Sequence, residues 1–364
     1  MPDFPIRDVF APLGWIFLVL LAVNAVLFIL LVLLREKWVL YRRRRERVRS
    51  RLTPSVERVV SGSDPEGLTE ELRPLVAGLS DADRPVAAWL LRDLTRDADE
   101  ATRTRVRRVV EETGAVKLAE RSTRRRTPWR RALACETLGA IGAERSVPVL
   151  EQRLRDRRSE VRMAAARSLG EIGSPAAASA LAAIFLDRKA VPTGVAYDAL
   201  RGLGPAGADA FHRGLRSHDP TVRVASCFGV AALAAERDDP DATDALARLL
   251  AGDDNVRVRT AAAKALGVVG GTAPPQALVA AVRDPEVRVR REVVATLGHF
   301  DEAASVETLV EAAGHGDREV ALRSAEALLA LRARPQAGAE ARAALASSSA
   351  WSVEYALTIS ELAA

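Results

Sequence analysis

The histidines and cysteines are the side chains of this sequence best suited to metal binding or nucleophilic catalysis. They are His212, His218, His299, His315, Cys135 and Cys227. No pair of histidines has the spacing of metal ligands, and the cysteines lie far from them along the chain. A phosphate-binding glycine loop and a Gly-x-Ser-x-Gly elbow are also absent from the sequence. We therefore predict no catalytic residue, no metal site and no cofactor, and we do not expect an enzyme.

Aspartate and arginine recur six residues apart, which suggests paired charges. The four pairs are Asp156 and Arg162, Asp253 and Arg259, Asp284 and Arg290, and Asp317 and Arg323. This spacing could stack the pairs as a ladder between neighbouring structural units. Partly shielded ion pairs of this kind fix register more than they support chemistry, so we interpret the ladder as structural.

Basic side chains gather in one segment that could bind anionic lipid head groups. Residues 35–51 hold 9 Lys and Arg against 2 Asp and Glu. The basic residues are Arg35, Lys37, Arg42, Arg43, Arg44, Arg45, Arg47, Arg49 and Arg51. Near an anionic membrane each is worth about 1 kcal/mol. Residues 132–364 hold 27 Lys and Arg against 30 Asp and Glu, so we predict no nucleic-acid partner.

An uncharged apolar run of 26 residues, 9–34, precedes this basic segment. About 20 such residues suffice for a helix to cross ~30 Å of hydrocarbon. We predict a transmembrane helix at 9–34, a short extracytoplasmic N-terminus at 1–8 and a basic juxtamembrane helix at 35–60. Basic residues beside a span stay in the cytoplasm. The expected protein is single-pass in the cell membrane, with its N-terminus outside and the remainder in the cytoplasm, where isolated cysteines are common.

Asn24 is the one amide near the middle of the predicted span. It is either tolerated there as a single polar group or hydrogen-bonded to a partner helix, a gain of about 0.5–2 kcal/mol. Two other interpretations of the run, a cleaved secretory signal and a buried core helix, fit its length and its basic flank less well.

After a linker at 61–65, residues 66–364 are expected to form helical hairpins. Aspartates mark the turn inside each hairpin, at intervals of 31 to 34 residues: Asp156, Asp187, Asp219, Asp253, Asp284 and Asp317. Proline follows two of them, as at the start of a capped helix. Glycines that stop the second helix are Gly142, Gly173, Gly204 and Gly270. A fixed period of this size predicts an all-α fold, an α-solenoid preceded by the single transmembrane helix, with its clearest repeats at 125–335.

This pattern resembles the HEAT-repeat family, specifically the short HEAT-like repeats of phycobilisome lyases. The resemblance rests on the turn aspartate, the Val-Arg after it, a run of small residues and a Leu-Gly-x-Ile/Val-Gly ending, as in residues 150–177 and 246–271. The pattern is broken at 192–193, where Pro-Thr replaces Val-Arg, and in the acidic connection 234–244.

The resemblance implies a protein that binds other macromolecules, because solenoids present long concave surfaces. We expect a non-catalytic, membrane-anchored scaffold or regulatory subunit with an integral-membrane or cytoplasmic protein as partner. A membrane-embedded glycosyltransferase of polysaccharide synthesis is one such partner. The alternatives are an enzyme similar to HEAT-like bilin lyases or DNA glycosylases, and a sensor of anionic lipid. In the sensor, Tyr41, Val48 and Leu52 share one face of a helix lying along the membrane.

Overall fold

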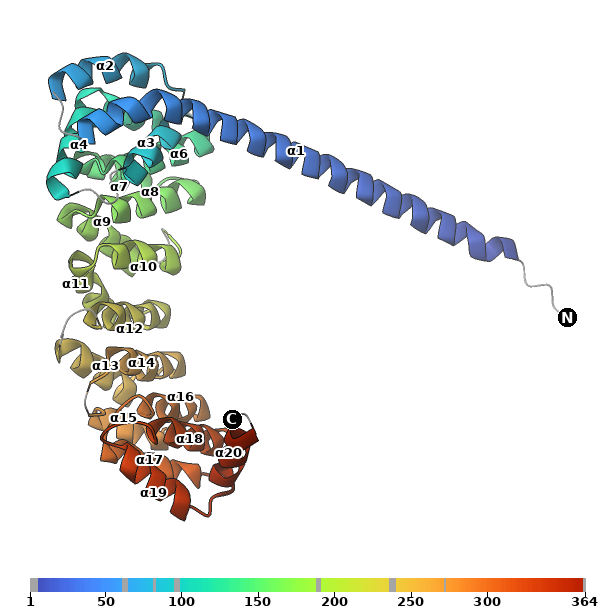
Figure 1. The fold of residues 1–364 in the computed structure, drawn as a ribbon, viewed down its shortest axis with the longest axis vertical. Coiled ribbons are helices and arrows are strands. Elements are labelled where there is room, and N and C mark those ends of the chain that lie inside the picture. Colours follow the sequence, from blue (N-terminus) through green and yellow to red (C-terminus); the bar gives the residue numbers. More distant parts are fainter. Residues whose placement is uncertain are drawn as a thin grey trace. The chain divides into compact units, whose positions relative to one another are not determined.

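The computed structural model describes residues 6–60, 65–80, 83–94, 99–187, 191–235, 240–271 and 273–362. Over these ranges the chain consists of helices joined by turns, with no β-strand (Figure 1). The chain divides into two compact units, Met1–Ala115 and Val116–Ala364.

The first unit is built on a long helix, α1 (Ile6–Val60), followed by α2 (Pro65–Ala77), α3 (Arg84–Leu94) and α4 (Glu100–Glu112). The C-terminal part of α1 packs against the three shorter helices (Figure 1). Glu71 of α2 accepts hydrogen bonds from Ser55 and Arg58 of α1 at 3.0 and 2.5 Å. The guanidinium of Arg58 lowers the pKa of this carboxyl, with a smaller effect from Ser55. The end of α1 is thus fixed to the helices that follow it.

The predicted span 9–34 and the predicted basic helix 35–60 lie within the single helix α1. From Leu20 to Val32, the large apolar side chains of α1 are 41% to 68% exposed. The side chains at 9–19, 33 and 34 lie outside the described residues. Where the structure describes the chain, no helix combines the length and apolar composition needed to cross a membrane. Residues 61–64 of the predicted linker are not described, and α2 begins at Pro65.

The apolar face that the sequence analysis expects to lie along a membrane is largely buried within the first unit. Val48 is 5% exposed and Leu52 is 4% exposed, in the part of α1 that packs on the shorter helices. The side chain of Tyr41 lies outside the described residues. Burial of two of the three face residues contradicts the expectation that this face contacts lipid.

The second unit continues the chain as a series of short helices. They are α5 (Ala115–Ser122), α6 (Pro128–Ile141), η1 (Glu144–Ser146), α7 (Val147–Arg153), α8 (Ser159–Ile172), α9 (Pro175–Leu186), α10 (Thr193–Gly202), α11 (Pro205–Gly214), α12 (Pro220–Ala234), α13 (Pro240–Gly252), α14 (Val256–Val269), α15 (Gln276–Ala280), η2 (Ala281–Arg283), α16 (Val287–Leu297), α17 (Ala303–Ala313), α18 (Arg318–Leu331), α19 (Gly338–Ser347) and α20 (Trp351–Leu362).

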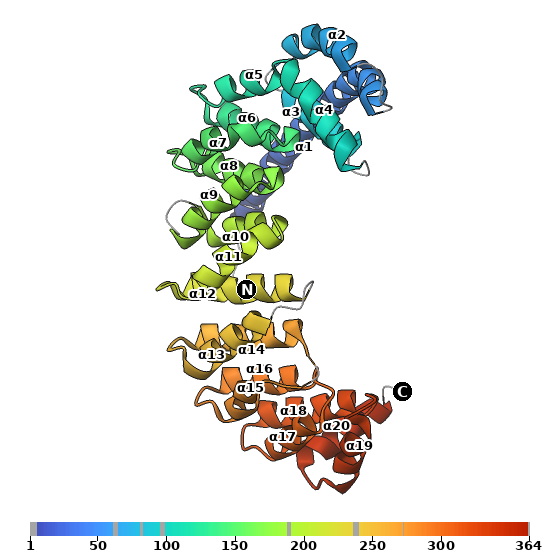
Figure 2. The same ribbon diagram turned by 90° about the vertical axis from the view of Figure 1, so that its left-hand side faces the viewer.

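These helices form two layers (Figure 2). Helices α6, α8, α10, α12, α14, α16, α18 and α20 stack on one another in chain order, and the helices between them form the second layer. The predicted all-α solenoid of helical hairpins is therefore confirmed. Residues 66–115 are grouped with α1 in the first unit.

Glycines let neighbouring helices of the first layer approach closely. A Cβ atom at Gly139 would lie 2.7 Å from the Cα of Ser168, and one at Gly170 would lie 2.9 Å from the Cα of Ala199. Both glycines directly follow a buried leucine. The Leu-Gly pair of the repeat is thus explained by packing, because a larger side chain would push two helix backbones apart.

Polar caps and glycines set several of these helix ends, as the sequence predicts. The predicted start at Asp284-Pro285 is wrong, because α16 begins at Val287, after Glu286. Asp219 accepts the Thr221 N–H at 2.8 Å at the start of α12. Gly142 and Gly173 end α6 and α8 in the left-handed conformation, with φ of 70° and 75°. Such a conformation costs glycine little, since it lacks a Cβ atom.

Candidate functional site at the turns of the first repeats

Arginine side chains join successive turns of the second unit. Arg259 of α14 donates through Nε and Nη2 to the carboxylate of Asp284, at 2.8 and 3.1 Å. Through Nη1 it donates to the main-chain oxygen of Asp253 at 2.8 Å. The Arg259 side chain is 11% exposed and that of Asp284 is 7% exposed. One arginine thus holds its own turn by the backbone and the next turn by the carboxylate.

Two further arginines make the same connection. Arg131 reaches the carboxylate of Asp156 at 2.9 and 2.8 Å, and Arg223 reaches that of Asp253 at 2.7 and 2.9 Å. Each also donates to a main-chain oxygen six residues earlier, at 3.1 and 2.8 Å. The residue at that earlier position is not aspartate, so the predicted Asp–Arg spacing did not identify these two arginines.

In two more of the predicted pairs the arginine contacts the backbone of its aspartate, as Arg259 does with Asp253. Arg162 donates to the main-chain oxygen of Asp156 at 2.9 Å, and Arg290 donates to that of Asp284 at 2.7 Å. The carboxylates of both aspartates instead accept from the arginine of the preceding repeat. Nε of Arg290 is buried and has no hydrogen-bond partner within the described part of the chain.

The fourth predicted pair does not form. Asp317 caps α18 by accepting the N–H groups of Glu319 and Val320, and Arg323 pairs with Glu319 at 3.4 Å. The place of the ladder aspartate is taken by His315, whose Nδ1 accepts the Asp317 N–H at 2.9 Å. Asp317 thus lies two residues later in its turn than the ladder aspartates Asp156, Asp253 and Asp284, at the capping position that Asp219 also occupies.

The turns before α6 and α8 border an open cavity of about 420 Å³. Its lining is nearly all basic: Arg124, Arg125, Arg126, Arg131, Gln152, Arg153, Arg155, Asp156 and Arg157. We call this the arginine cavity. Arg124, Arg126, Arg155 and Arg157 are exposed, and none of the four has an ion-pair partner among the residues that the structure describes.

The one carboxylate of the arginine cavity is already paired. Burial by itself would raise the pKa of Asp156, but hydrogen bonds from Arg131 and from the Arg158 N–H, with the charge of Arg153, outweigh it. The pKa of Asp156 therefore lies below its usual range. Nη1 of Arg153 lies 3.7 Å from the same carboxylate. Among the described residues, the positive charge of Arg124, Arg126, Arg155 and Arg157 is left uncompensated.

Sequence reasoning missed the arginine cavity because it summed charge over long segments. The count of 27 basic against 30 acidic residues over 132–364 averages a basic turn at 155–158 with acidic turns further on. The boundary at 131 also separated that turn from the arginines at 124–126. Two arginine clusters about one repeat apart were the available signal.

The residues predicted to contact lipid lie along α1. Those with described side chains, Arg35, Arg42, Arg43, Arg47, Arg49 and Arg51, are exposed. The side chains of Lys37, Arg44 and Arg45 lie outside the described residues. Asn24 is exposed, and its Nδ2 donates to the Leu20 main-chain oxygen of its own helix at 2.9 Å.

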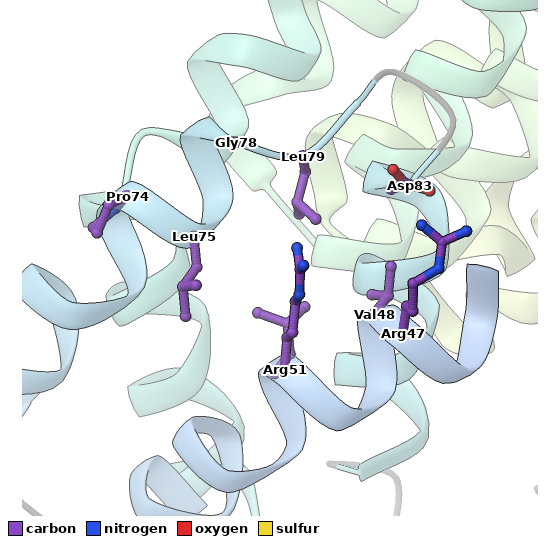
Figure 3. A pocket seen from close by; sticks show the side chains of 9 residues that line it. Arg47, Val48, Arg51, Pro74, Leu75, Gly78, Leu79 and Asp83 are labelled. Carbon is purple, nitrogen blue, oxygen red and sulfur yellow. The ribbon is translucent and has the colours of Figure 1, made fainter. Parts of the chain in front are cut away.

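Two of these arginines line a small pocket of about 170 Å³ in the first unit. Arg47 and Arg51 extend from α1 toward the connection between α2 and α3, with Arg47 on the side of Asp83 (Figure 3). Leu75 and Leu79 supply apolar surface beside them (Figure 3). The pocket joins α1 to its neighbours and is smaller than the cavities that usually bind small molecules.

The cysteines are packing residues in this fold. Cys135 and Cys227 are fully buried, and burial raises the pKa of each thiol to about 12. A thiol with so high a pKa is not a nucleophile at neutral pH. Among the described residues, no three His, Cys, Asp or Glu side chains are grouped in a way that could hold a metal ion.

The family model described as HEAT repeats matches residues 115–201, 208–292 and 274–360. No relative among curated proteins matches the chain. In crystal structures, the karyopherin Kap121p and Kap121p bound to Nup53p are 12% and 13% identical to it, each with a TM-score of 0.50. These matches cover 76% and 75% of this chain, but the chain spans only 35% and 34% of Kap121p.

At such identity the likeness to Kap121p concerns the fold alone. Human deoxyhypusine hydroxylase in complex with glycerol is 22% identical over 70% of this chain and 96% of its own, with a TM-score of 0.30. That superposition is too poor to carry an activity from one protein to the other. The HEAT model, by contrast, matches more than half of the chain, over the same residues that form the stacked hairpins. The chain therefore belongs to the HEAT-repeat family.

Proposed function

We propose that this protein is a non-catalytic, membrane-anchored scaffold or regulatory subunit that presents its HEAT unit to a partner protein. The observation that carries the proposal is the exposed apolar segment 20–32 of α1, on the same chain as a folded HEAT unit. Its ten large apolar side chains are unfavourable in water. At about 0.3–0.6 kcal/mol each, they would favour membrane insertion by about 3–6 kcal/mol.

The charges after this segment support an orientation. Arg35, Arg42 and Arg43 are exposed on α1 directly beyond the apolar residues. Basic residues next to a span stay on the cytoplasmic side, where they also contact anionic head groups. We therefore propose a single-pass protein of the cell membrane with its N-terminus outside and its HEAT unit in the cytoplasm.

A protein partner is supported by the HEAT unit. The likeness to the short repeats of phycobilisome lyases concerns repeat type, and we propose no bilin chemistry for this chain. A single-span protein with a large solenoid suits a subunit that accompanies a multi-span membrane enzyme. A membrane-embedded glycosyltransferase is the first partner to test. This choice rests only on the architecture of one span followed by a solenoid. Asn24 on α1 is the residue that would contact a partner helix within the membrane.

Extraction of membranes with alkaline carbonate tests the anchor. The full chain should remain in the pellet. The variant Leu27→Arg/Leu30→Arg should be released, because each arginine at a helix centre costs about 2.5–3.5 kcal/mol. The matched control is Val268→Arg/Val310→Arg, which should remain in the pellet because both residues lie in the HEAT unit. Leu27 and Val268 are both 50% exposed, so the substitutions are comparable. Release of the unaltered chain would refute the anchor.

Purification in mild detergent tests the scaffold. A stoichiometric membrane protein should accompany the full chain and should be lost when the HEAT unit is deleted. Proteolysis of intact cells, with the outer membrane permeabilised if there is one, should leave a C-terminal tag protected. Recovery of the chain alone under several gentle conditions would contradict the scaffold, and cleavage of the tag would contradict the orientation.

A further inference from the structure

The arginine cavity carries more positive charge than the ladder uses. Arg131 joins its own turn to Asp156 and is nearly buried. Arg124 and Arg126 come from the turn before α6, and Arg155 and Arg157 from the turn before α8. Four guanidinium groups gathered at one open cavity repel one another. The repeat fold itself gives no reason for this excess, because later turns of the unit are built without it.

The turns that bear these arginines are held in place before any ligand arrives. Nη1 of Arg131 donates to the main-chain oxygens of Arg125 and Arg126, at 3.1 and 2.9 Å. The Arg158 N–H donates to the Asp156 carboxylate at 3.0 Å. Arg153 reaches the Thr123 main-chain oxygen at 3.4 Å. A rim fixed in this way loses little backbone entropy when an anion binds.

The chemistry of the rim favours phosphate. Guanidinium groups present a planar fork that matches phosphate oxygens in pairs, and they remain charged at every physiological pH. We propose that the arginine cavity binds a compact ligand bearing two or more phosphate groups, either a soluble polyphosphate compound or a phosphorylated lipid head group. A volume of about 420 Å³ lies within the range of small-ligand sites.

We infer a compact ligand because the basic surface covers only two turns. The later turns at 253–256 and 284–287 contain no arginine and carry Asp254 and Glu286 besides their ladder aspartates, so the excess of arginine ends within a few repeats. A nucleic-acid strand needs a basic stripe along its backbone. A small polyanion needs only the two turns at 124–126 and 155–157.

Calorimetric titration of the full chain in nonionic detergent tests the proposal. One probe is sodium tripolyphosphate, and the other is dioctanoyl phosphatidylinositol 4,5-bisphosphate below its micelle concentration. Arg155→Gln/Arg157→Gln should weaken binding at least about tenfold, which is about 1.4 kcal/mol. The control Arg257→Gln/Arg288→Gln removes the same charge from two exposed positions elsewhere in the unit and should change affinity little.

Each outcome has one meaning. Binding of tripolyphosphate that depends on the cavity supports a soluble ligand, and cavity-dependent binding of the lipid alone supports a head group. No binding of either probe overturns the proposal, as does an equal loss in the control. Equally tight binding of hexaglutamate would overturn the phosphate chemistry. Should the first variant melt at a lower temperature than the unaltered chain, Arg124→Gln/Arg126→Gln provides the same test on the other turn.

Discussion

Replacing Asp284 by Asn should destabilise the HEAT unit by removing one connection of the arginine ladder. The substitution keeps the shape of the side chain and its acceptor for the Glu286 N–H, now 2.8 Å away. It removes the charge that receives two hydrogen bonds from Arg259, at 2.8 and 3.1 Å. In the variant Oδ1 still accepts from Arg259 Nη2, but an amide nitrogen replaces the Oδ2 that accepts from Arg259 Nε. The guanidinium then stays nearly buried without its counter-charge and with one hydrogen bond fewer.

The expected loss is about 2–3 kcal/mol in the free energy of unfolding. Breaking a fully buried ion pair costs about 3–5 kcal/mol, and we take a lower value because this pair lies at the turn edge, near solvent. Urea unfolding of the full chain, followed by circular dichroism, measures the loss. The control is Glu311→Gln, which breaks the exposed pair with Arg283 and should change the midpoint little.

A double-mutant cycle with Arg259→Gln separates the pair from its surroundings. The coupling energy should be at least about 1 kcal/mol, because both partners are nearly buried and share two hydrogen bonds. If Asp284→Asn shifts the midpoint no more than Glu311→Gln, the ladder does not stabilise the stack and our reasoning about it fails.

Four further outcomes follow from other parts of the structure. Gly139→Ala should destabilise the chain by about 1–3 kcal/mol, because the new Cβ meets a helix backbone. Gly202→Ala, with open space around it, should not destabilise the chain, and thermal unfolding compares the two variants. Cys135 should resist iodoacetamide at pH 8 until urea unfolds the chain, because its pKa is about 12. Because the pKa of Asp156 is lowered, its carboxylate stabilises the fold at neutral pH, and this contribution is lost as the pH falls below about 4. In Asp156→Asn the free energy of unfolding, measured by urea titration at each pH, should fall less steeply over that range. His315→Asp should raise the unfolding midpoint by supplying a carboxylate to the buried Nε of Arg290, and an unchanged midpoint would contradict this.

The sequence was sufficient for the repeat architecture because each hairpin carries its own local signals. Asp219 and Pro220 start α12, and Gly142 and Gly173 end two other helices in the left-handed conformation. It was not sufficient for the connections between hairpins. Arg223 pairs with a carboxylate 30 residues away, and its identification requires knowing which turns are adjacent.

The same difference between local and assembled information explains the arginine cavity. Asp156 could be recognised as a turn residue, but only the stacked turns show that Arg131 already uses its charge. A carboxylate used in this way stabilises the fold and cannot also neutralise the rim. The ladder needs one arginine per turn, and the turn at 155–158 contributes three beyond that requirement. Because folding does not require this excess, a bound anion is the explanation that the structure supports.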